Sequence, residues 1–268
     1  MAKKNWRAYG KNFRDELNNT SGIMSAMGLG LATIATVISA PYVAAFGGIT
    51  AGGSLLYAAV KSKPEDLLEP DDVLGKQLDL NELDNLHPRV MGIGIVGATR
   101  VGKSTLLDNL RFEASSDTRT DELYAVVVKL QTTGNKYIAL IDGAGQEYGQ
   151  QFEIAQNSDF LTIVLDHNES DDAIDIDSHR LAAHEQFVDQ IERNLRKKEK
   201  RKRVHFILNK NDLWAENSDT GALTDWFTEI VNNFELKNLA VKVTSAIHSN
   251  MKTSSVTKFN NAVIEEVQ

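Results

Sequence analysis

The stretch from residue 97 to residue 104 reads Gly-Ala-Thr-Arg-Val-Gly-Lys-Ser and follows the pattern G-x-x-x-x-G-K-[ST]. An apolar, strand-like run precedes it at residues 90–96, and a helix-like run follows it at residues 105–110. Glycines at both ends allow the backbone to curl so that successive N–H groups face inward, and the following helix directs the positive end of its dipole at the same point. The sequence therefore predicts a loop that binds polyphosphate, formed by Gly97, Ala98, Thr99, Arg100, Val101, Gly102, Lys103, Ser104 and Thr105.

The same pattern predicts a magnesium ion beside the phosphates. We expect Lys103 to reach the β- and γ-phosphates and the Ser104 hydroxyl to be a Mg²⁺ ligand. The alternating run at residues 136–141 ends in Asp142, where an acid at a strand end can hold Mg²⁺ through water. Gly145 lies three residues farther on and can offer an N–H to the γ-phosphate.

Two later segments indicate which base is bound. The apolar run at residues 204–208 ends in Asn209-Lys210-Asn211-Asp212. Only guanine presents both N1–H and an exocyclic amine to a carboxylate, so Asp212 would select it, and the Lys210 stem would lie across the purine ring. Residues 240–243 then lead into Thr244-Ser245-Ala246, which we interpret as a turn whose backbone N–H meets the guanine oxygen.

With these motifs in order, the chain from about residue 88 to residue 268 resembles a Ras-like small GTPase domain of the P-loop, TRAFAC-type superfamily. The resemblance implies an α/β fold with a six-stranded, mostly parallel sheet and helices on both faces, and GTP or GDP with Mg²⁺ as ligands. It also implies that Gln146 orients the attacking water, that Lys103 stabilises the transferring phosphoryl group, and that hydrolysis is slow. Thr99 and Arg100 replace glycines common in relatives, which argues against activation in the Ras manner; Arg100 is either a cation acting in cis or an exposed loop residue.

The resemblance further implies a threonine that coordinates Mg²⁺ and senses the γ-phosphate. Thr118 and Thr120 both lie in the polar stretch at residues 115–122. The distance along the chain to Asp142 favours Thr120, and the alternative for either residue is a solvated loop position.

Composition excludes some other classes of protein. The chain of 268 residues contains no cysteine, so disulfides and thiolate metal sites are ruled out. The formal net charge of −8 argues against nucleic acid as the main partner. The six histidines are scattered, and we interpret them as ordinary polar residues.

The first third of the chain carries a different signal. Residues 17–60 contain no charged side chain, and Pro41 divides this run into apolar stretches at 22–39 and 42–60. Each is long enough to cross a bilayer core about 30 Å thick, and basic residues flank the pair. We therefore expect a transmembrane hairpin with both ends in the cytoplasm; the alternative is a helical pair packed on the domain or in an oligomer.

Small residues in this segment recur at helical spacing. One row contains Ala44, Gly48 and Gly52, and another contains Ala26 and Gly30. Such rows let helices approach closely, so they predict either self-association or packing within one hairpin.

The sequence thus predicts a hydrophobic hairpin at residues 1–60, an acidic linker at 61–87 and a GTPase domain at 88–268. A basic run at residues 193–203 indicates either a solvated helix end or contact with anionic lipid. The function expected is a membrane-tethered switch that faces the cytoplasm and acts on an unidentified protein partner there. The alternative is a membrane effector whose glycine-rich hairpin oligomerises in, or perturbs, the bilayer under GTP control.

Overall fold

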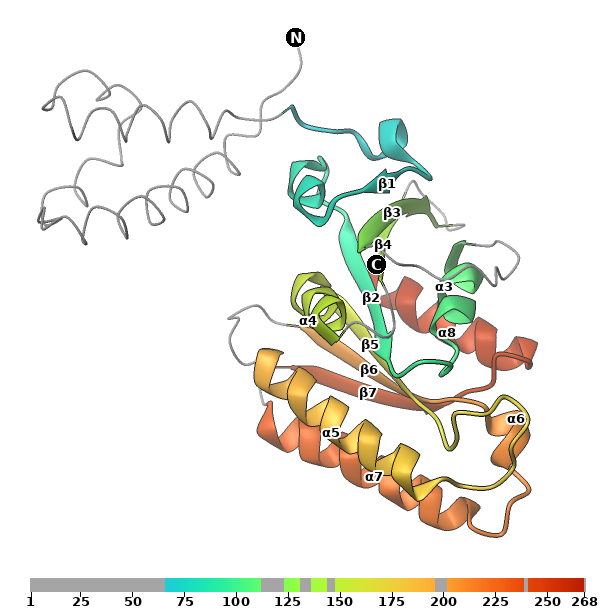
Figure 1. Cartoon of the computed structure of the whole chain (residues 1–268). Helices are drawn as coiled ribbons and strands as arrows, with labels where there is room; N and C mark the ends of the chain where they lie inside the picture. The colour runs from blue at the N-terminus through green and yellow to red at the C-terminus, as the bar shows by residue number, and fades with distance from the viewer. Residues whose placement is uncertain are drawn as a thin grey trace, which may run out of the picture. The chain divides into compact units, whose positions relative to one another are not determined.

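The computed structural model describes residues 66–111, 123–130, 136–143, 148–195, 202–238 and 241–267 (Figure 1). The hairpin expected at residues 1–60 lies outside these ranges, so it stays a prediction. Pro70–Leu83 and Pro88–Gln268 belong to one compact unit, while residues 66–69 and 84–87 belong to another. Within the described part of the chain, no helix is long and apolar enough to cross a membrane.

The larger unit is built on a sheet whose described strands run in the order β1-β3-β4-β2-β5-β6-β7. Strands β2, β4, β5, β6 and β7 are parallel, whereas β3 pairs antiparallel with both β1 and β4. Strand β5, which lies between β2 and β6, is buried along its whole length, as expected for a continuous apolar run covered on both faces. The strands span Gln77–Leu78 (β1), Met91–Gly97 (β2), Tyr124–Lys129 (β3), Tyr137–Asp142 (β4), Phe160–Leu165 (β5), Arg203–Leu208 (β6) and Lys242–Ile247 (β7).

Helices cover both faces of this sheet (Figure 1). One apolar core lies beneath α4 (Tyr148–Asn157), α5 (Ser178–Leu195) and α7 (Thr220–Lys237). The other lies beneath α3 (Lys103–Arg111) and α8 (Thr253–Val267), while the short α6 (Asn211–Trp214) follows β6. The expected α/β class with helices on both faces is therefore confirmed.

The sheet has seven described strands rather than the six expected, because β1 comes from the acidic segment that we interpreted as a linker. Gln77 pairs with Val126 and Leu78 with Ala125, and the Gly75 N–H donates to the Val127 carbonyl at 2.9 Å. The 3₁₀ helices η1 (Pro70–Val73) and η2 (Leu80–Asn85) flank this strand. A strand of two residues has no periodicity to detect in the sequence, so the acidic composition dominated the prediction.

Candidate phosphate and base site

The phosphate loop lies where predicted, between the end of β2 and the start of α3. Arg100 has φ 63° and Gly102 has φ 93°, so the loop contains left-handed residues that turn its N–H groups inward. A Cβ on Gly102 would lie 2.4 Å from Asn250 Nδ2 and 2.5 Å from Asn209 Nδ2, so the close approach of these two amides requires glycine. Arg100 is not a glycine, so its positive φ strains the backbone, as is common in ligand-binding loops.

Lys103 is held inside the loop by backbone oxygens. Its Nζ donates to the Gly97 carbonyl at 2.9 Å and to the Ala98 carbonyl at 2.7 Å. Burial lowers the pKa of Lys103 from 10.5 to about 8, although the nearby Asp142 carboxylate acts in the opposite direction. The amine is thus desolvated and close to the expected magnesium ligand before any phosphate contributes to the site.

Gln151, on α4, fixes the end of β2, and our sequence interpretation missed it. Its Oε1 accepts from the Gly97 N–H at 2.8 Å, and its Nε2 donates to the Gly97 carbonyl at 2.9 Å. The side chain is only 2% exposed. A glutamine in an amphipathic helix normally indicates a surface position, so the sequence offered no signal for this contact.

The oxygens expected to hold magnesium lie on adjacent elements. Ser104 is in the first turn of α3, and Asp142 ends β4, with its Oδ1 accepting from the Gly143 N–H at 2.9 Å. Among the described residues, no group of three or more acidic, histidine or cysteine side chains is arranged so that it could hold a metal ion by itself. A hydroxyl and one carboxylate suit Mg²⁺, which keeps several waters and takes its other ligands from substrate phosphates. The residues present therefore fit this ion.

The base-recognition segment is joined directly to the phosphate loop. Asn209 Nδ2 donates to the Val101 carbonyl at 2.8 Å, and Asn250 Nδ2 donates to the Gly102 carbonyl at 3.3 Å. Among the described residues the buried Asn209 Oδ1 has no hydrogen-bond partner, which leaves one acceptor for a ligand. Asp212 accepts a hydrogen bond from Ser249 Oγ, which orients the carboxylate expected to select guanine.

The structure differs from our interpretation of Thr244-Ser245-Ala246. These residues are part of β7, where Ser245 pairs with Phe206 and Ala246 with Ile207. The segment that lies beside Asp212 is instead His248 to Asn250, whose first residue accepts from the Asn211 N–H at 3.0 Å. Small residues suggested a turn after residue 243, but pairing with β6 carries the strand four residues farther, to Ile247.

Lys210 also differs from the expectation in this structure, because its amine lies against the acid-rich loop after β5. Its Nζ lies 3.0 Å from Asp166 Oδ2 and 3.1 Å from Asp171 Oδ1. It also donates to the Asn168 carbonyl at 3.1 Å. The residue has φ 60°, so the backbone turns sharply at this position.

Thr118, Thr120, Gly145 and Gln146 all lie outside the described residues. Their proposed roles stay predictions.

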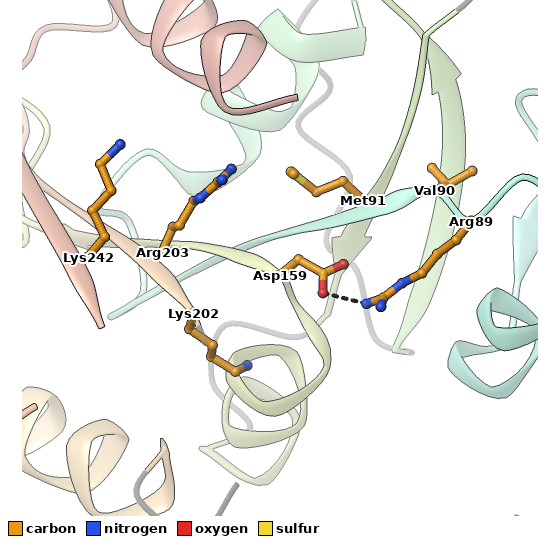
Figure 2. A pocket seen from close by; sticks show the side chains of 7 residues that line it. All are labelled: Arg89, Val90, Met91, Asp159, Lys202, Arg203 and Lys242. Atoms are coloured by element: carbon orange, nitrogen blue, oxygen red, sulfur yellow. Dashed lines mark hydrogen bonds and ion pairs between the residues drawn. The ribbon is translucent and has the colours of Figure 1, made fainter. Parts of the chain in front are cut away.

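A cavity of about 550 Å³ lies at the opposite end of the parallel strands from the phosphate loop, where these strands begin (Figure 2). Its cations are Arg89, Lys202, Arg203 and Lys242. Arg89 Nη2 is 2.6 Å from Asp159 Oδ1, and Lys202 Nζ donates to carbonyls at the end of α4, including Ser158 at 2.9 Å. Arg203 and Lys242 both pair with Glu266 near the end of α8. These cations largely neutralise acids and helix carboxyl ends, so we do not assign the phosphates to this cavity.

Comparison with known proteins supports the assignment of the phosphate loop. Residues 92–210 match the family model described as 50S ribosome-binding GTPase. No curated protein matches the chain significantly.

Solved structures that are similar to this chain share little of its sequence, as two examples show. The Roco2 RocCORdC protein of Methanosarcina barkeri bound to GDP is 18% identical, with 72% of this chain and 51% of that chain covered, at a TM-score of 0.44. The Arl6 BBS3 small GTPase of Trypanosoma brucei with bound GppNp is 16% identical, with 66% of this chain and 96% of that chain covered, at a TM-score of 0.48. This chain thus spans about half the length of the Roco2 chain.

The family match covers most of β2, the whole phosphate loop and the first two residues of the base-recognition segment, Asn209 and Lys210, and it ends before Asp212. The structure brings these parts to the carboxyl ends of the parallel strands. Together these observations support a P-loop GTPase domain in this chain.

Proposed function

We propose that this protein is a guanine-nucleotide switch that binds GTP and GDP with Mg²⁺ and hydrolyses GTP slowly. The observation that carries this proposal is the position of Lys103, whose desolvated amine is held on the Gly97 and Ala98 carbonyls inside a left-handed loop. A buried cation in such a loop is stabilised when polyphosphate oxygens replace the missing water.

Each side chain has a stated task in this proposal. Lys103 and the amides of the phosphate loop bind the phosphates and stabilise charge on the transferring group. Asp212, oriented by Ser249, selects guanine, and Gln146 orients the attacking water. Ser104, Asp142 and Thr120 would hold Mg²⁺, which would supply positive charge beside the polyphosphate.

Fluorescent GTP and GDP analogues, with ATP as competitor, test the binding. We expect micromolar or tighter binding of both guanine nucleotides, weakened by Ser104→Asn more for GTP than for GDP. Preference for ATP, or equal loss of GTP and GDP in this variant, would contradict the assignment.

Single-turnover hydrolysis tests the role of Gln146. Gln146→Leu is expected to keep GTP affinity and to lower the rate about tenfold or more, which corresponds to about 1.4 kcal/mol of barrier. A wild-type rate in this variant would mean that another group positions the water, with Arg100 the first to test.

We further propose that the hydrophobic segment tethers the domain to a membrane, with the domain in the cytoplasm where GTP is found. Support comes from the uncharged run at residues 17–60 and its basic flanks. Detergent extraction and protease protection of the full-length protein test this. Ile34→Lys in the middle of the first stretch should release the protein, since a charge there costs about 2.5–3.5 kcal/mol on insertion scales.

A second function, in which GTP controls hairpin assembly in the bilayer, draws on the small-residue rows at Ala44, Gly48 and Gly52. Dye leakage from liposomes separates the two functions. Leakage that depends on a GTP analogue favours the membrane effector, and intact liposomes favour the switch with a cytoplasmic protein partner.

A further inference from the structure

Asp166, at the carboxyl end of β5, is a fully buried carboxylate with three cationic or polar partners. Arg180 Nε donates to Asp166 Oδ1 at 2.8 Å, and His184 Nε2 lies 2.8 Å from the same oxygen. The Lys210 amine lies 3.0 Å from Oδ2. Burial alone raises the pKa of Asp166, but its hydrogen bonds with His184 and Arg180 outweigh burial and lower the pKa to about 2. The carboxylate is therefore charged at any physiological pH.

Arg180 extends this cluster into the phosphate loop. The residue lies in the first turn of α5, and its side chain is 9% exposed. While Nε faces Asp166, Nη2 donates to the Thr99 carbonyl at 2.6 Å. The planar guanidinium thus joins a fixed carboxylate to one backbone oxygen of the loop, which a point-charge ammonium cannot do in the same geometry.

The same carboxylate also holds the base-recognition loop, because Lys210 is its third partner. Asp166 therefore contacts residues that lead to both halves of the nucleotide site: Arg180 to Thr99 at the phosphates, and Lys210 beside Asp212 at the base. Arg180 donates to the Thr99 carbonyl and Lys103 donates to the neighbouring Ala98 carbonyl at 2.7 Å, so the cluster lies close to the phosphate-binding amine.

We propose that Arg180 is a positioning residue for phosphoryl transfer, which acts through the Thr99 carbonyl and is itself fixed by Asp166. This inference rests on the proposed GTP hydrolysis and adds a specific residue to it. When Arg180 is replaced, Asp166 still binds Lys210 and His184, so the core is retained. The phosphate loop, however, loses the contact that sets its shape at Thr99, and small errors of position there reduce the rate of reaction.

The test compares Arg180→Lys and Arg180→Ala with wild type in full-length protein, measuring single-turnover GTP hydrolysis, GTP-analogue affinity and thermal unfolding. Arg193→Ala is the matched control, since Arg193 is an exposed arginine on the same helix. We expect both Arg180 variants to lower the hydrolysis rate at least tenfold while affinity falls less than threefold. Added methylguanidinium should restore part of the rate in Arg180→Ala, and Arg193→Ala should behave as wild type.

A double-mutant cycle tests whether Asp166 and Arg180 act through the same interaction. Asp166→Asn combined with Arg180→Ala should slow hydrolysis no more than the more damaging single change. Wild-type hydrolysis in both Arg180 variants, or additive losses in the double variant, would overturn the proposal. Loss of the unfolding transition in both variants would also overturn it, because Arg180 would then serve only the fold. Failure of wild-type protein to bind or hydrolyse GTP is a different result, and it contradicts the proposed function itself.

Discussion

Asn209 and Val101 are separated by more than a hundred residues, yet the Asn209 side-chain amide donates to the Val101 carbonyl at 2.8 Å. The first residue of the base-recognition motif therefore holds the middle of the phosphate loop. Its other amide atom, Oδ1, is buried without a partner among the described residues. The two halves of the site are thus formed together rather than separately.

Asn209→Ala should weaken GTP and GDP binding alike, by at least tenfold, or about 1.4 kcal/mol. Removing the amide leaves a buried carbonyl unpaired, and such a group costs about 1–3 kcal/mol. Equilibrium titration with fluorescent nucleotides measures the effect. Asn232→Ala, an exposed asparagine on α7, is the control and should bind as wild type.

Gln151→Leu should lower the free energy of unfolding of nucleotide-free protein by about 2–4 kcal/mol. The reason is that the Gly97 N–H and carbonyl both lose their contacts with this side chain, while its size is nearly kept. Urea unfolding measures the change, and Glu153→Ala serves as an exposed control on the same helix. A change smaller than about 0.5 kcal/mol would show that water or backbone rearrangement replaces the glutamine.

GTP binding should weaken as pH rises above 8. Burial lowers the Lys103 pKa from 10.5 to about 8, so the folded, nucleotide-free protein releases this proton between these values while the unfolded chain keeps it. The contribution of Lys103 to the free energy of unfolding consequently rises with pH across this window. Phosphate binding requires the ammonium form of Lys103, so nucleotide binding above pH 8 takes up a proton. The affinity for GTP therefore falls by up to about tenfold per pH unit.

Calorimetry in two buffers of different ionisation enthalpy measures this proton uptake. The measurement is made at pH 8.5, which is about half a unit above the Lys103 pKa. Lys103→Arg does not titrate in this range and corrects for ionisation of the guanine. Identical proton uptake in the two proteins would place the Lys103 pKa outside the window.

Asp212→Asn should move base preference from GTP toward xanthosine triphosphate, because the C2 carbonyl of xanthine accepts where the guanine amine donates. In a competition assay, we expect this variant to bind xanthosine triphosphate at least tenfold more tightly than GTP. Ser249→Ala should weaken guanine selection without reversing it, because Ser249 only orients the carboxylate. Unchanged preference in Asp212→Asn would exclude this residue from base recognition.

A chain that begins at residue 88 should be less stable than one that begins at residue 66. Val73 and Leu78 are each 6% exposed, and a buried side chain of this kind contributes about 1.5–3 kcal/mol. Removal of β1 also exposes the edge of β3 to pairing with other molecules. Urea unfolding and light scattering compare the two chains, and equal stability would return the acidic segment to the role of a spacer.

The parts that could be predicted from sequence are those coded locally. The phosphate loop was found because its glycines, lysine and serine are close together in the sequence and flanked by apolar runs, and β6 lies where the apolar run at residues 204–208 predicts it. Gln151 and Asp166 could not be found in this way, because their partners are 54 and 18 residues away and their residue types are typical of surfaces. His184, which we interpreted as an ordinary polar residue, is wholly buried against Asp166 for the same reason. The end of β7 was misplaced because pairing with β6, rather than its own composition, sets where it stops.

The pairing of β1 with β3 has a mechanical consequence. The chain that leaves residue 69 reaches β2 only after it has passed along the edge of the sheet, where Gln77 and Leu78 are hydrogen-bonded to the strand beside β4. A pulling force applied from the N-terminal side is first resisted at Leu68, whose N–H donates to the Asn85 carbonyl and whose carbonyl accepts from the His87 N–H, both at 2.9 Å. The edge contacts of β1 resist it next. The phosphate loop lies at the far end of β2, whose pairing with β4 and β5 distributes such a load over the sheet.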